Sequence, residues 1–388
     1  MGSGVEVTSK NKYPFVFVHG MFGWGSAIGI DKFSPYWGST TGNLMNYLNE
    51  KGYECYSASV GPVSSAWDNA CELYAQLMGT RVDYGVAHSG FHHHERFGRT
   101  YSKPLFDGFK NTRVHLIGHS HGGQVIRLLA HLLTYGDEAE KAATDENDLS
   151  DLFKGGNENL ISSVVSVCAP NNGTTLFGLA EKANIVQPLG RAVDFVLGIV
   201  GRTAIHGRFI DYQLEQYGLT PLRGEKKADK LITAMNRMRD TDDNVLTDLS
   251  FKGAYELNKK IEICPNVNYF CYTANGWTEK NQKPDKIRFP LLKPISRLIA
   301  TRELPEPQYG IVFDESWLKN DGLVNTPSGK NPVDEPSREF DGNIEPGIWN
   351  VMPELVCDHG QAAGLMANKE TLHTFYTDLS EMLITTEK

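Results

Sequence analysis

The sequence predicts an α/β fold in which a mostly parallel central sheet carries helices on both faces. Runs rich in β-branched and aromatic residues recur along the chain, and segments with helical periodicity separate them. Continuous β-rich runs that are separated by helical patterns favour a parallel sheet covered on both faces. With 388 residues, the chain is long enough to bury a large core, and we expect one domain spanning 1–388.

Five of these runs are predicted as strands. They occupy residues 15–18, 54–60, 114–117, 164–168 and 268–273. Apolar residues at Leu44, Tyr47 and Leu48 indicate a helix before the second strand. The first strand leads into a glycine-rich loop that begins at His19. Alternation of strands with helical segments favours parallel pairing.

The third strand runs into a pattern that points to chemistry. Gly118-His119-Ser120-His121-Gly122 follows the strand, and a helical pattern with apolar residues on one face comes next. Strand, G-x-S-x-G and helix in this order are typical of a nucleophile elbow, whose glycines permit a sharp turn that raises the serine above the sheet. The alternative is a tight glycine turn with an exposed serine. The flanking order favours Ser120 as a nucleophile.

Ser120 then needs a general base, and His359 is favoured. It lies late in the chain, in an irregular polar stretch suited to a loop above a sheet. Four other histidines compete for the role: His19, His119, His121 and His373. Two of them flank the serine too closely in sequence, one precedes the first glycine loop, and one lies on a helical pattern near the end.

The carboxylate that orients the base is predicted to be Asp321. It is followed by Gly322 and an apolar pair, and it precedes the histidine as acids of this type do. Its alternative role is a turn-forming Asp-Gly pair. Asp314 is the main rival, and Asp358 is adjacent to His359 and would point elsewhere.

An oxyanion hole is expected to use two backbone N–H groups. One belongs to His121, the residue after the nucleophile, and the other to Met21, in the loop after the first strand. Only backbone atoms are required, so the side chains at these positions can vary.

Bulk composition excludes some partner classes. Acidic residues outnumber basic ones, 47 to 38, which gives a net charge of −9 and argues against a nucleic-acid partner. No transmembrane segment or signal peptide is visible, and the Met-Gly-Ser-Gly start looks like an expression remnant. We expect an extracellular protein whose signal peptide is not part of this chain. The six cysteines form no C-x-x-C pair and do not fix the compartment.

Two segments interrupt the alternation of strands and helices. The first, 62–101, contains Asp68, His88 and the cluster 92–94, and imidazole with carboxylate suits a tetrahedral zinc site. A solvated histidine loop is the alternative. The second, 175–248, contains an apolar stretch at 192–200 that is too short to span a bilayer. This stretch is predicted as either a core helix or a lid over the site.

A set of longer motifs is distributed along nearly the whole chain: V-H-G-x-x-G-W-G (18–25), Y-W-G (36–38), V-G-P-V-S-S-x-W-D-x-A-C-E (60–72), V-D-Y-G-x-A-H (82–88), R-F-G-R-T-Y (96–101), G-H-S-x-G-G-Q (118–124), A-P-x-x-G-T-T (169–175), Y-E-L-N (255–258) and N-D-G-x-V-N-T (320–326). In these motifs the chain resembles the Geobacillus-type thermoalkalophilic lipases, which are related to the staphylococcal lipases. It resembles clostridial-type esterases that attack aliphatic–aromatic polyesters at least as well.

This resemblance implies an α/β-hydrolase fold with an inserted zinc-binding segment at 62–101 and a helical lid at 175–248. It also implies a catalytic triad and a structural zinc site remote from the chemistry. The triad falls on Ser120, Asp321 and His359, and the zinc ligands fall on Asp68, His88, His94 and Asp248.

Four positions depart from the family. His121 replaces a glutamine, and Met21 replaces an aromatic residue in the oxyanion loop. Gln361 and Met366 stand where the family carries carboxylate ligands for calcium. Amide and thioether groups suit Ca²⁺ poorly, so we predict no calcium at that place.

The expected function is hydrolysis of carboxylic esters, with acylglycerols, simple acyl esters and, as an extension, polyester chains as substrates. Two other classes are weighed against it. One is a zinc hydrolase in which metal-bound water is the nucleophile, and the other is a lipid-binding protein with a vestigial site. The sequence gives no indication of the oligomeric state.

Overall fold

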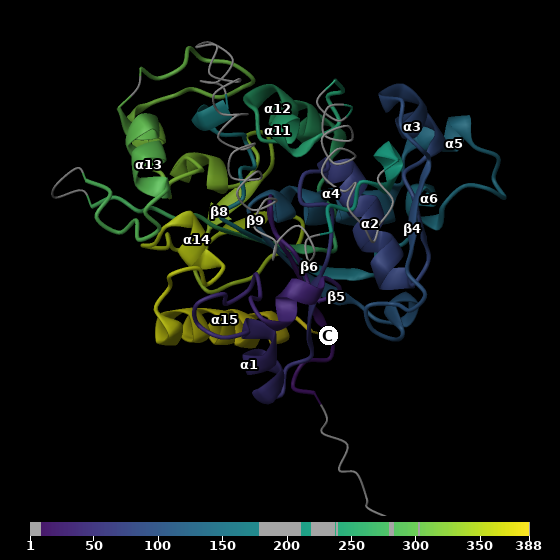
Figure 1. Ribbon diagram of the computed structural model, residues 1–388, viewed down its shortest axis with the longest axis horizontal. Coiled ribbons are helices and arrows are strands. Elements are labelled where there is room, and N and C mark those ends of the chain that lie inside the picture. Colours follow the sequence, from purple (N-terminus) through teal and green to yellow (C-terminus); the bar gives the residue numbers. More distant parts are fainter. Residues whose placement is uncertain are drawn as a thin grey trace, which may run out of the picture.

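The computed structural model describes residues 9–177, 211–218, 237, 240–278, 283–301 and 303–387. Within these residues an all-parallel, seven-stranded sheet forms the centre (Figure 1), in the order β2-β1-β5-β6-β7-β9-β8. The strands are β1 (Phe15–Val18), β2 (Cys55–Ala58), β5 (Val114–His119), β6 (Ile161–Val167), β7 (Asn268–Tyr272), β8 (Ser337–Glu339) and β9 (Trp349–Val351). The first five match the predicted strands. The last two were not predicted, because three residues each give no periodic signal.

Helices connect the strands and cover the sheet. The α-helices are α1 (Leu44–Glu50), α2 (Ala66–Met78), α3 (Val86–His92), α4 (His121–Tyr135), α5 (Glu138–Ala143), α6 (Asp151–Lys154), α11 (Val245–Asp248), α12 (Phe251–Lys260), α13 (Leu292–Ala300), α14 (His359–Ala362) and α15 (Lys369–Ile384). Short 3₁₀ helices are η1 (Gly29–Lys32), η2 (Phe109–Asn111), η3 (Glu215–Tyr217), η4 (Glu315–Leu318) and η5 (Thr326–Gly329).

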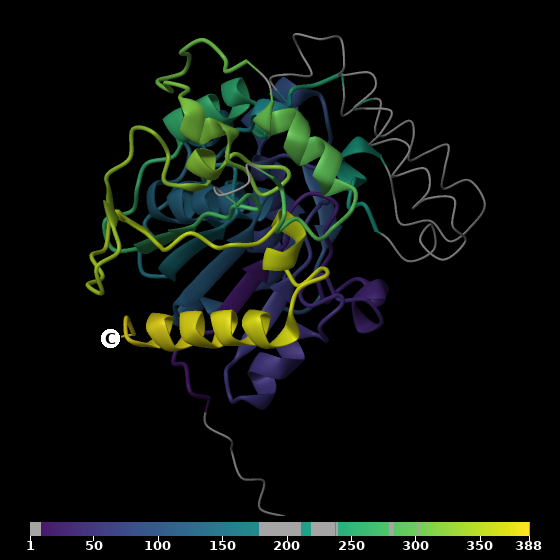
Figure 2. The ribbon, with the colours of Figure 1, turned by 90° about the vertical axis from the view of Figure 1, so that its left-hand side faces the viewer.

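Both faces of the sheet are buried, as the apolar strands predict. Phe15 and Phe17 point toward the layer formed by α1 and α15, whereas Val16 and Val18 point toward α2 and α4. Figure 2 shows α15 running below the sheet. Phe17 is fully buried, so its replacement by alanine would cost about 3–5 kcal/mol of folding free energy. The two hydrophobic cores, one on each face, hold these strands in place.

Because the strands are parallel, their carboxyl ends meet at one edge of the sheet. The loop after β1 begins at His19, Ser120 follows β5, and Cys168 follows β6. Side chains at these three places are therefore close together. All six cysteines are free thiols, and five of them are buried.

The predicted segment 62–101 contains α2, α3 and a separate antiparallel pair, β3 (Arg81–Asp83) with β4 (Phe97–Thr100). Most of the predicted lid lies outside the described residues, including the apolar stretch 192–200. Its described parts include η3 and α11. Among the residues that the structure describes, no helix has the length and apolar character needed to span a membrane.

Candidate active site

Ser120 occupies a strained turn between β5 and α4. Its φ of 56° and ψ of −131° lie in a region that non-glycine residues rarely adopt, at a cost of about 1–3 kcal/mol. The turn needs its glycines. A Cβ on Gly118 would lie 2.4 Å from the Gly122 carbonyl oxygen, and one on Gly122 would lie 2.4 Å from the Val18 oxygen. The Ser120 N–H donates to Val167 O at 2.9 Å, which holds the turn on β6.

His359 and Asp321 form a tight pair. Nδ1 of His359 lies 2.7 Å from Oδ2 of Asp321, and the His359 N–H donates to the Asp321 carbonyl at 2.9 Å. The other carboxylate oxygen accepts the N–H groups of Leu323 and Val324 at 3.0 and 2.8 Å. Since an ionised carboxylate only accepts, Nδ1 must carry the proton. Nε2 is then the nitrogen that can accept a proton.

The rival acids have structural roles. Asp358 is fully buried at the N-terminus of α14, where its side chain accepts N–H groups of Arg288, Phe289 and Gln361. Gln361 in turn accepts the Asp358 N–H at 3.0 Å and completes a capping box. Asp314 is exposed and caps η4.

The rival histidines are also engaged elsewhere. Burial lowers the pKa of His19 to about 4, and its Nε2 accepts the Val60 N–H at 3.2 Å. His373, on α15, stacks on Tyr47 with ring centroids 3.6 Å apart.

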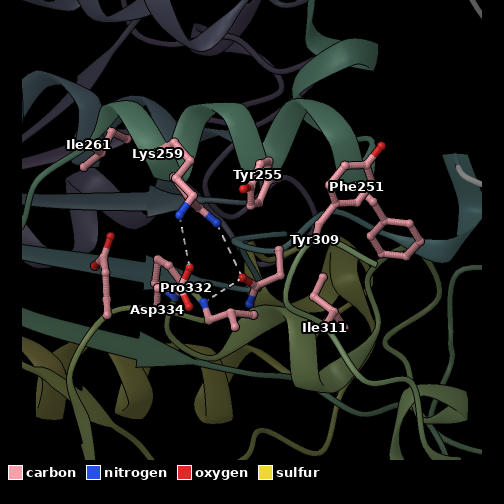
Figure 3. A pocket seen from close by; sticks show the side chains of 12 residues that line it. Phe251, Tyr255, Lys259, Ile261, Tyr309, Ile311, Pro332 and Asp334 are labelled. Carbon is pink, nitrogen blue, oxygen red and sulfur yellow. Dashed lines mark hydrogen bonds and ion pairs between the residues drawn. The ribbon is translucent and has the colours of Figure 1, made fainter. Parts of the chain in front are cut away.

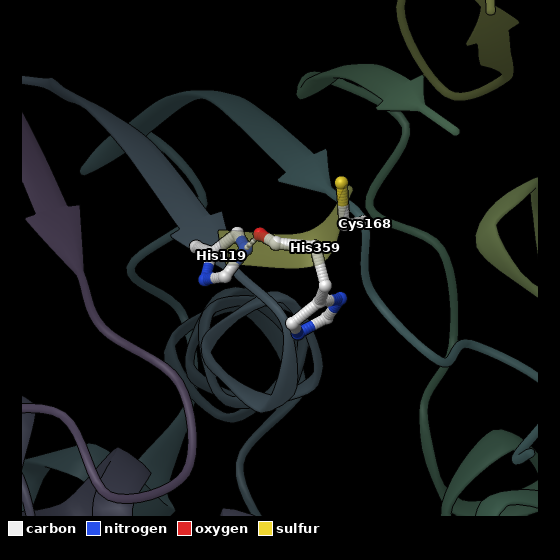
Figure 4. A group of neighbouring side chains, drawn as sticks. All are labelled: His119, Cys168 and His359. Carbon is white, nitrogen blue, oxygen red and sulfur yellow. Dashed lines mark hydrogen bonds between the residues drawn. The ribbon is translucent and has the colours of Figure 1, made fainter. Parts of the chain in front are cut away.

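A series of buried hydrogen bonds joins the turn that carries Ser120 to His359. The Tyr36 hydroxyl accepts the Gly20 N–H at 3.1 Å, so its own proton goes to Nδ1 of His119 at 2.6 Å. His119 Nε2 then donates to the His359 carbonyl at 3.0 Å (Figure 4). Burial, followed by the neighbouring His359, lowers the pKa of His119 well below its usual value, so this ring is neutral. These hydrogen bonds hold the backbone of His359 next to His119, the residue that precedes Ser120.

Cys168 lies with His119 and His359 in a group whose donor atoms are within 4.8 Å of one another (Figure 4). Both ring nitrogens of His119 are already hydrogen-bonded, so this group is poorly suited to a metal. Burial, with the Asp321 carboxylate next in importance, raises the pKa of the Cys168 thiol well above its usual value. It therefore stays protonated.

Within the described residues, no hydrogen bond links the Ser120 hydroxyl to the His359 ring. Such bonds are often long in a free enzyme and tighten with substrate. Ser120 and His359 are both largely buried, with 8% and 6% of their surface exposed.

The loop after β1 approaches the serine closely. A Cβ on Gly20 would lie 2.6 Å from Ser120 Cβ, so only glycine fits there. The next residue is Met21, and its backbone N–H has no hydrogen-bond partner among the described residues. The N–H of His121 lies in the first turn of α4, where no intrahelical acceptor exists.

The His121 side chain points away from this pair of donors. Its Nε2 lies 3.0 Å from Oδ2 of Asp248, and the same oxygen accepts the Ala66 N–H at 2.6 Å. Gln124, one turn further along α4, donates to the Asp248 carbonyl at 3.1 Å. The end of α11 is thereby fastened to the first turn of α4.

A second cluster combines two carboxylates with two imidazoles, three of them from the 62–101 segment and the fourth from the stretch just before α11. Its members are Asp68, His88, His94 and Asp243, whose donor atoms lie within 4.8 Å of one another. His88 Nε2 is 3.4 Å from Asp68 Oδ1 and 3.3 Å from Asp243 Oδ2. His94 Nε2 is 3.9 Å and 3.2 Å from the same two atoms.

This cluster fits a tetrahedral divalent metal. Among the described residues, Asp68 Oδ1, His88 Nε2 and His94 Nε2 are buried without a hydrogen-bond partner, and a metal would satisfy all three. Burial and the nearby Asp243 carboxylate raise the pKa of Asp68, a repulsion that a cation would relieve. Gln216 donates to the other oxygen of Asp68 at 2.7 Å, as supporting groups around metal ligands do.

The structure corrects one predicted ligand. Asp248 is not part of this cluster, and Asp243 takes its place. Asn244 caps α11 and Asp243 precedes it, whereas Asp248 ends that helix about one turn later and faces His121. The only sequence indication that Asp243 could bind a metal was its place in the acidic stretch 240–243. Sequence spacing alone did not distinguish it from Asp248 as a ligand.

A hollow of about 180 Å³ lies under α12, between Phe251, Tyr255 and Tyr309 (Figure 3). A Lys259–Asp334 ion pair of 3.7 Å crosses its mouth. Pockets for small-molecule ligands usually enclose about 300–1,000 Å³. The residues lining this hollow include none of the candidate catalytic groups.

We expect Tyr36→Phe to lower the free energy of unfolding by about 1–3 kcal/mol, because the Gly20 N–H and His119 Nδ1 lose their common partner. Urea unfolding followed by circular dichroism measures this. Tyr47→Phe is the matched control, since that hydroxyl makes only a 3.4 Å contact with Thr377. Equal losses in both variants would contradict a special role for Tyr36.

Comparison with known proteins identifies the family. The family model described as "Lipase-like, C-terminal domain" matches residues 11–388. The chain belongs to this lipase-like family. The lipase-like chain is 38% identical over 396 residues to a lipase of Staphylococcus hyicus and 34% identical over 389 residues to Lipase 1 of Staphylococcus aureus. Each match covers 98% of this chain but 58% and 55% of the relatives, so the chain spans about half their length.

Solved structures agree with the sequence comparisons. The crystal structure of Staphylococcus hyicus lipase superposes with a TM-score of 0.82 at 34% identity, covering 98% of this chain and 97% of that one. EstA from Clostridium botulinum gives 0.82 and 34%, covering 97% and 88%. Lipase 1 from Pelosinus fermentans gives 0.81 and 34%, covering 96% and 98%. These likenesses confirm the predicted α/β-hydrolase-like fold.

Proposed function

We propose that this lipase-like chain is a serine carboxylic-ester hydrolase. The observation that carries the proposal is the Asp321–His359 pair, bonded at 2.7 Å and fixed through His119 beside the strained turn that presents Ser120. A buried carboxylate that holds a histidine with Nε2 free is what a general base for a serine requires.

In the proposed reaction, Ser120 Oγ attacks the ester carbonyl carbon while His359 Nε2 takes the hydroxyl proton. The Met21 and His121 N–H groups donate to the oxygen that becomes negative. His359 returns the proton to the leaving alcohol, and an acyl-serine remains. Water, deprotonated by the same nitrogen, then releases the carboxylic acid and restores Ser120. Asp321 stabilises the charged imidazole throughout.

The substrates proposed are acylglycerols and simple acyl esters, with aliphatic–aromatic polyesters as an extension. Relatives named lipase support the first class, and the second class follows from the same ester chemistry. The narrower resemblance to Geobacillus-type lipases belongs to the same proposal and rests on the sequence motifs alone. An extracellular location of the enzyme is part of the proposal too.

The cluster Asp68, His88, His94 and Asp243 is proposed to hold a structural zinc ion. Four protein ligands leave no open position for water, which distinguishes structural from catalytic zinc. Bound there, zinc would neutralise two buried carboxylates. It would also connect α2 and α3 to Asp243, which lies just before α11. A single domain with an inserted zinc-binding segment at 62–101 and a lid at 175–248 belongs to the same proposal, and the lid rests on the sequence resemblance alone.

Turnover of a chromogenic short-chain ester tests the function. We expect activity that a serine-directed organophosphate abolishes and that brief treatment with a chelator leaves in place. Loss with chelator but not with organophosphate would instead assign a metal-bound water as nucleophile. No turnover of any ester, with lipid binding retained, would leave only a binding protein.

We expect Asp248→Ala to lower kcat about tenfold while bound zinc stays at one equivalent. The change removes the acceptor for His121 Nε2 and Ala66 N–H, which loosens the turn that carries an oxyanion donor. Steady-state kinetics and elemental analysis of the same preparation measure both. Loss of zinc in this variant would restore Asp248 as a ligand and contradict the assignment of Asp243.

A further inference from the structure

Helix α13 presents a row of apolar side chains to solvent. Leu291, Pro294 and Leu298 are exposed and follow one another at intervals of three and four residues, which places them on one stripe of the helix. Leu291 is 59% and Leu298 37% exposed. Single exposed leucines are common on protein surfaces, whereas a continuous stripe on one helix marks an interaction site.

The opposite side of α13 packs on the loop that holds Asp321. Leu292 is buried there, 2.9 Å from where a Cβ on Gly322 would lie. Ser296 Oγ donates to Asn320 Oδ1 at 2.7 Å. These contacts join α13 directly to the loop that holds Asp321.

The chain leading into α13 is bonded to the other half of the catalytic pair. The N–H groups of Arg288 and Phe289 donate to Oδ2 of Asp358, at 2.6 and 3.0 Å. Asp358 directly precedes His359 and caps α14. Figures 1 and 2 show α13 and α14 on the same side of the molecule. A surface that binds α13 would thus lie next to the Asp321–His359 pair.

The charge around the stripe is opposite to that of the whole chain. Residues 283–300 contain five basic residues and one acidic residue, a local charge of +4 in a chain of −9. Lys293 and Arg297 lie one turn apart on the solvent side of α13, next to the apolar stripe, and both are exposed. Apolar residues bordered by cations suit the surface of an anionic lipid layer.

We propose that α13 docks on a negatively charged lipid–water interface, with Leu291 and Leu298 inserted and Lys293 and Arg297 at the level of the anionic groups. The proposal rests on the proposed function, which supplies the charge. Hydrolysis of an ester by water gives an alcohol and a carboxylic acid, and the acid loses its proton near neutral pH. A lipid surface under attack therefore becomes anionic, and the basic residues hold the enzyme on it.

Vesicle binding by the full chain carrying Ser120→Ala tests this, because that variant cannot alter the lipid. Co-sedimentation is measured with vesicles of phosphatidylcholine alone and with vesicles containing 30% phosphatidylglycerol. We expect at least about tenfold tighter binding to the anionic vesicles. Adding Lys293→Gln with Arg297→Gln should remove that preference, and adding Leu291→Ser with Leu298→Ser should weaken binding to both vesicles about tenfold.

Two control variants match these changes. Lys103→Gln with Lys110→Gln removes two exposed cations elsewhere, and Phe91→Ser removes an apolar side chain that is 78% exposed on α3. Figure 1 places α3 on the side opposite α13. We expect both controls to bind as the parent does. Thermal unfolding of every variant checks that the fold is retained.

Three results would overturn the proposal: no vesicle binding by the parent, equal losses in the control variants, or parent-like binding in the α13 variants. A dimer that the α13 variants abolish, without vesicle binding, would assign the stripe to a contact between two copies. Turnover of a soluble ester by the chain with Ser120 intact reports separately on the proposed function. Its failure is distinguishable, since the binding experiment needs no catalysis.

Discussion

Ser120→Ala is expected to lower kcat for a soluble chromogenic ester by a factor of about 10⁴–10⁶. The change removes the attacking oxygen, and the remaining rate comes from the oxyanion donors and from binding alone. The fold should persist, because the hydroxyl makes no hydrogen bond with any residue that the structure describes. Steady-state kinetics and thermal unfolding measure the two properties in the same preparation.

Two further variants sharpen this prediction. Asp321→Asn should cost about 10⁴ in kcat, since the amide cannot stabilise a charged imidazole. Asp314→Asn is the matched control, because that carboxylate is exposed and caps η4. Combining Ser120→Ala with Asp321→Asn should add little to the serine variant alone. A fully active Ser120→Ala protein, or an inactive Asp314→Asn protein, would contradict the assignment.

Removal of the metal is expected to lower the midpoint of thermal unfolding by about 10 °C or more. Without a cation, the buried carboxylates of Asp68 and Asp243 repel each other, and three polar atoms lack partners. Prolonged dialysis against a strong chelator, followed by calorimetry, measures the shift. Readdition of zinc should restore the original midpoint, and magnesium should not, because two imidazoles suit zinc.

A matched pair of variants tests which carboxylate binds the metal. Asp243→Ala should lose bound zinc and show the lowered midpoint without chelator. Asp242→Ala removes the neighbouring exposed carboxylate and should keep both properties. Two results would contradict the proposal of a structural zinc ion. One is an unchanged zinc content in Asp243→Ala, and the other is a midpoint of the parent chain that does not respond to the chelator.

Much of the fold was predictable because it depends on long, regular patterns. The central strands β1, β5 and β6 are buried along their whole length, and each contains a run of β-forming residues that can be recognised in the sequence alone. Strands β8 and β9 were not predictable. Each has three residues, and β8 is polar, so it is a strand only because it pairs with β9.

The candidate site also contains residues that the sequence predicts and contacts that it does not. Ser120 was predictable because strand, turn and helix are contiguous in sequence. His359 and Asp321 followed from chain order and from motifs, and the structure places them 2.7 Å apart. The link through Tyr36 and His119 was not predicted, because it joins three separate segments by hydrogen bonds that leave no periodic pattern.

The proposed fourth zinc ligand shows what family motifs alone do not decide. Asp243 and Asp248 lie five residues apart in an acidic region, and only the start of α11 decides which of them faces His88 and His94. The side chain that replaces the family's glutamine, His121, has Asp248 as its partner. A residue-by-residue comparison cannot show that pairing.

The central claim is that His359 activates Ser120 for attack on a carbonyl. Tandem mass spectrometry after treatment with a fluorophosphonate ester tests it most directly. The account predicts one label per chain, on Ser120, and a labelling rate at least about a thousandfold lower in His359→Ala. A label on any other residue, or a rate on Ser120 that does not depend on His359, would contradict it.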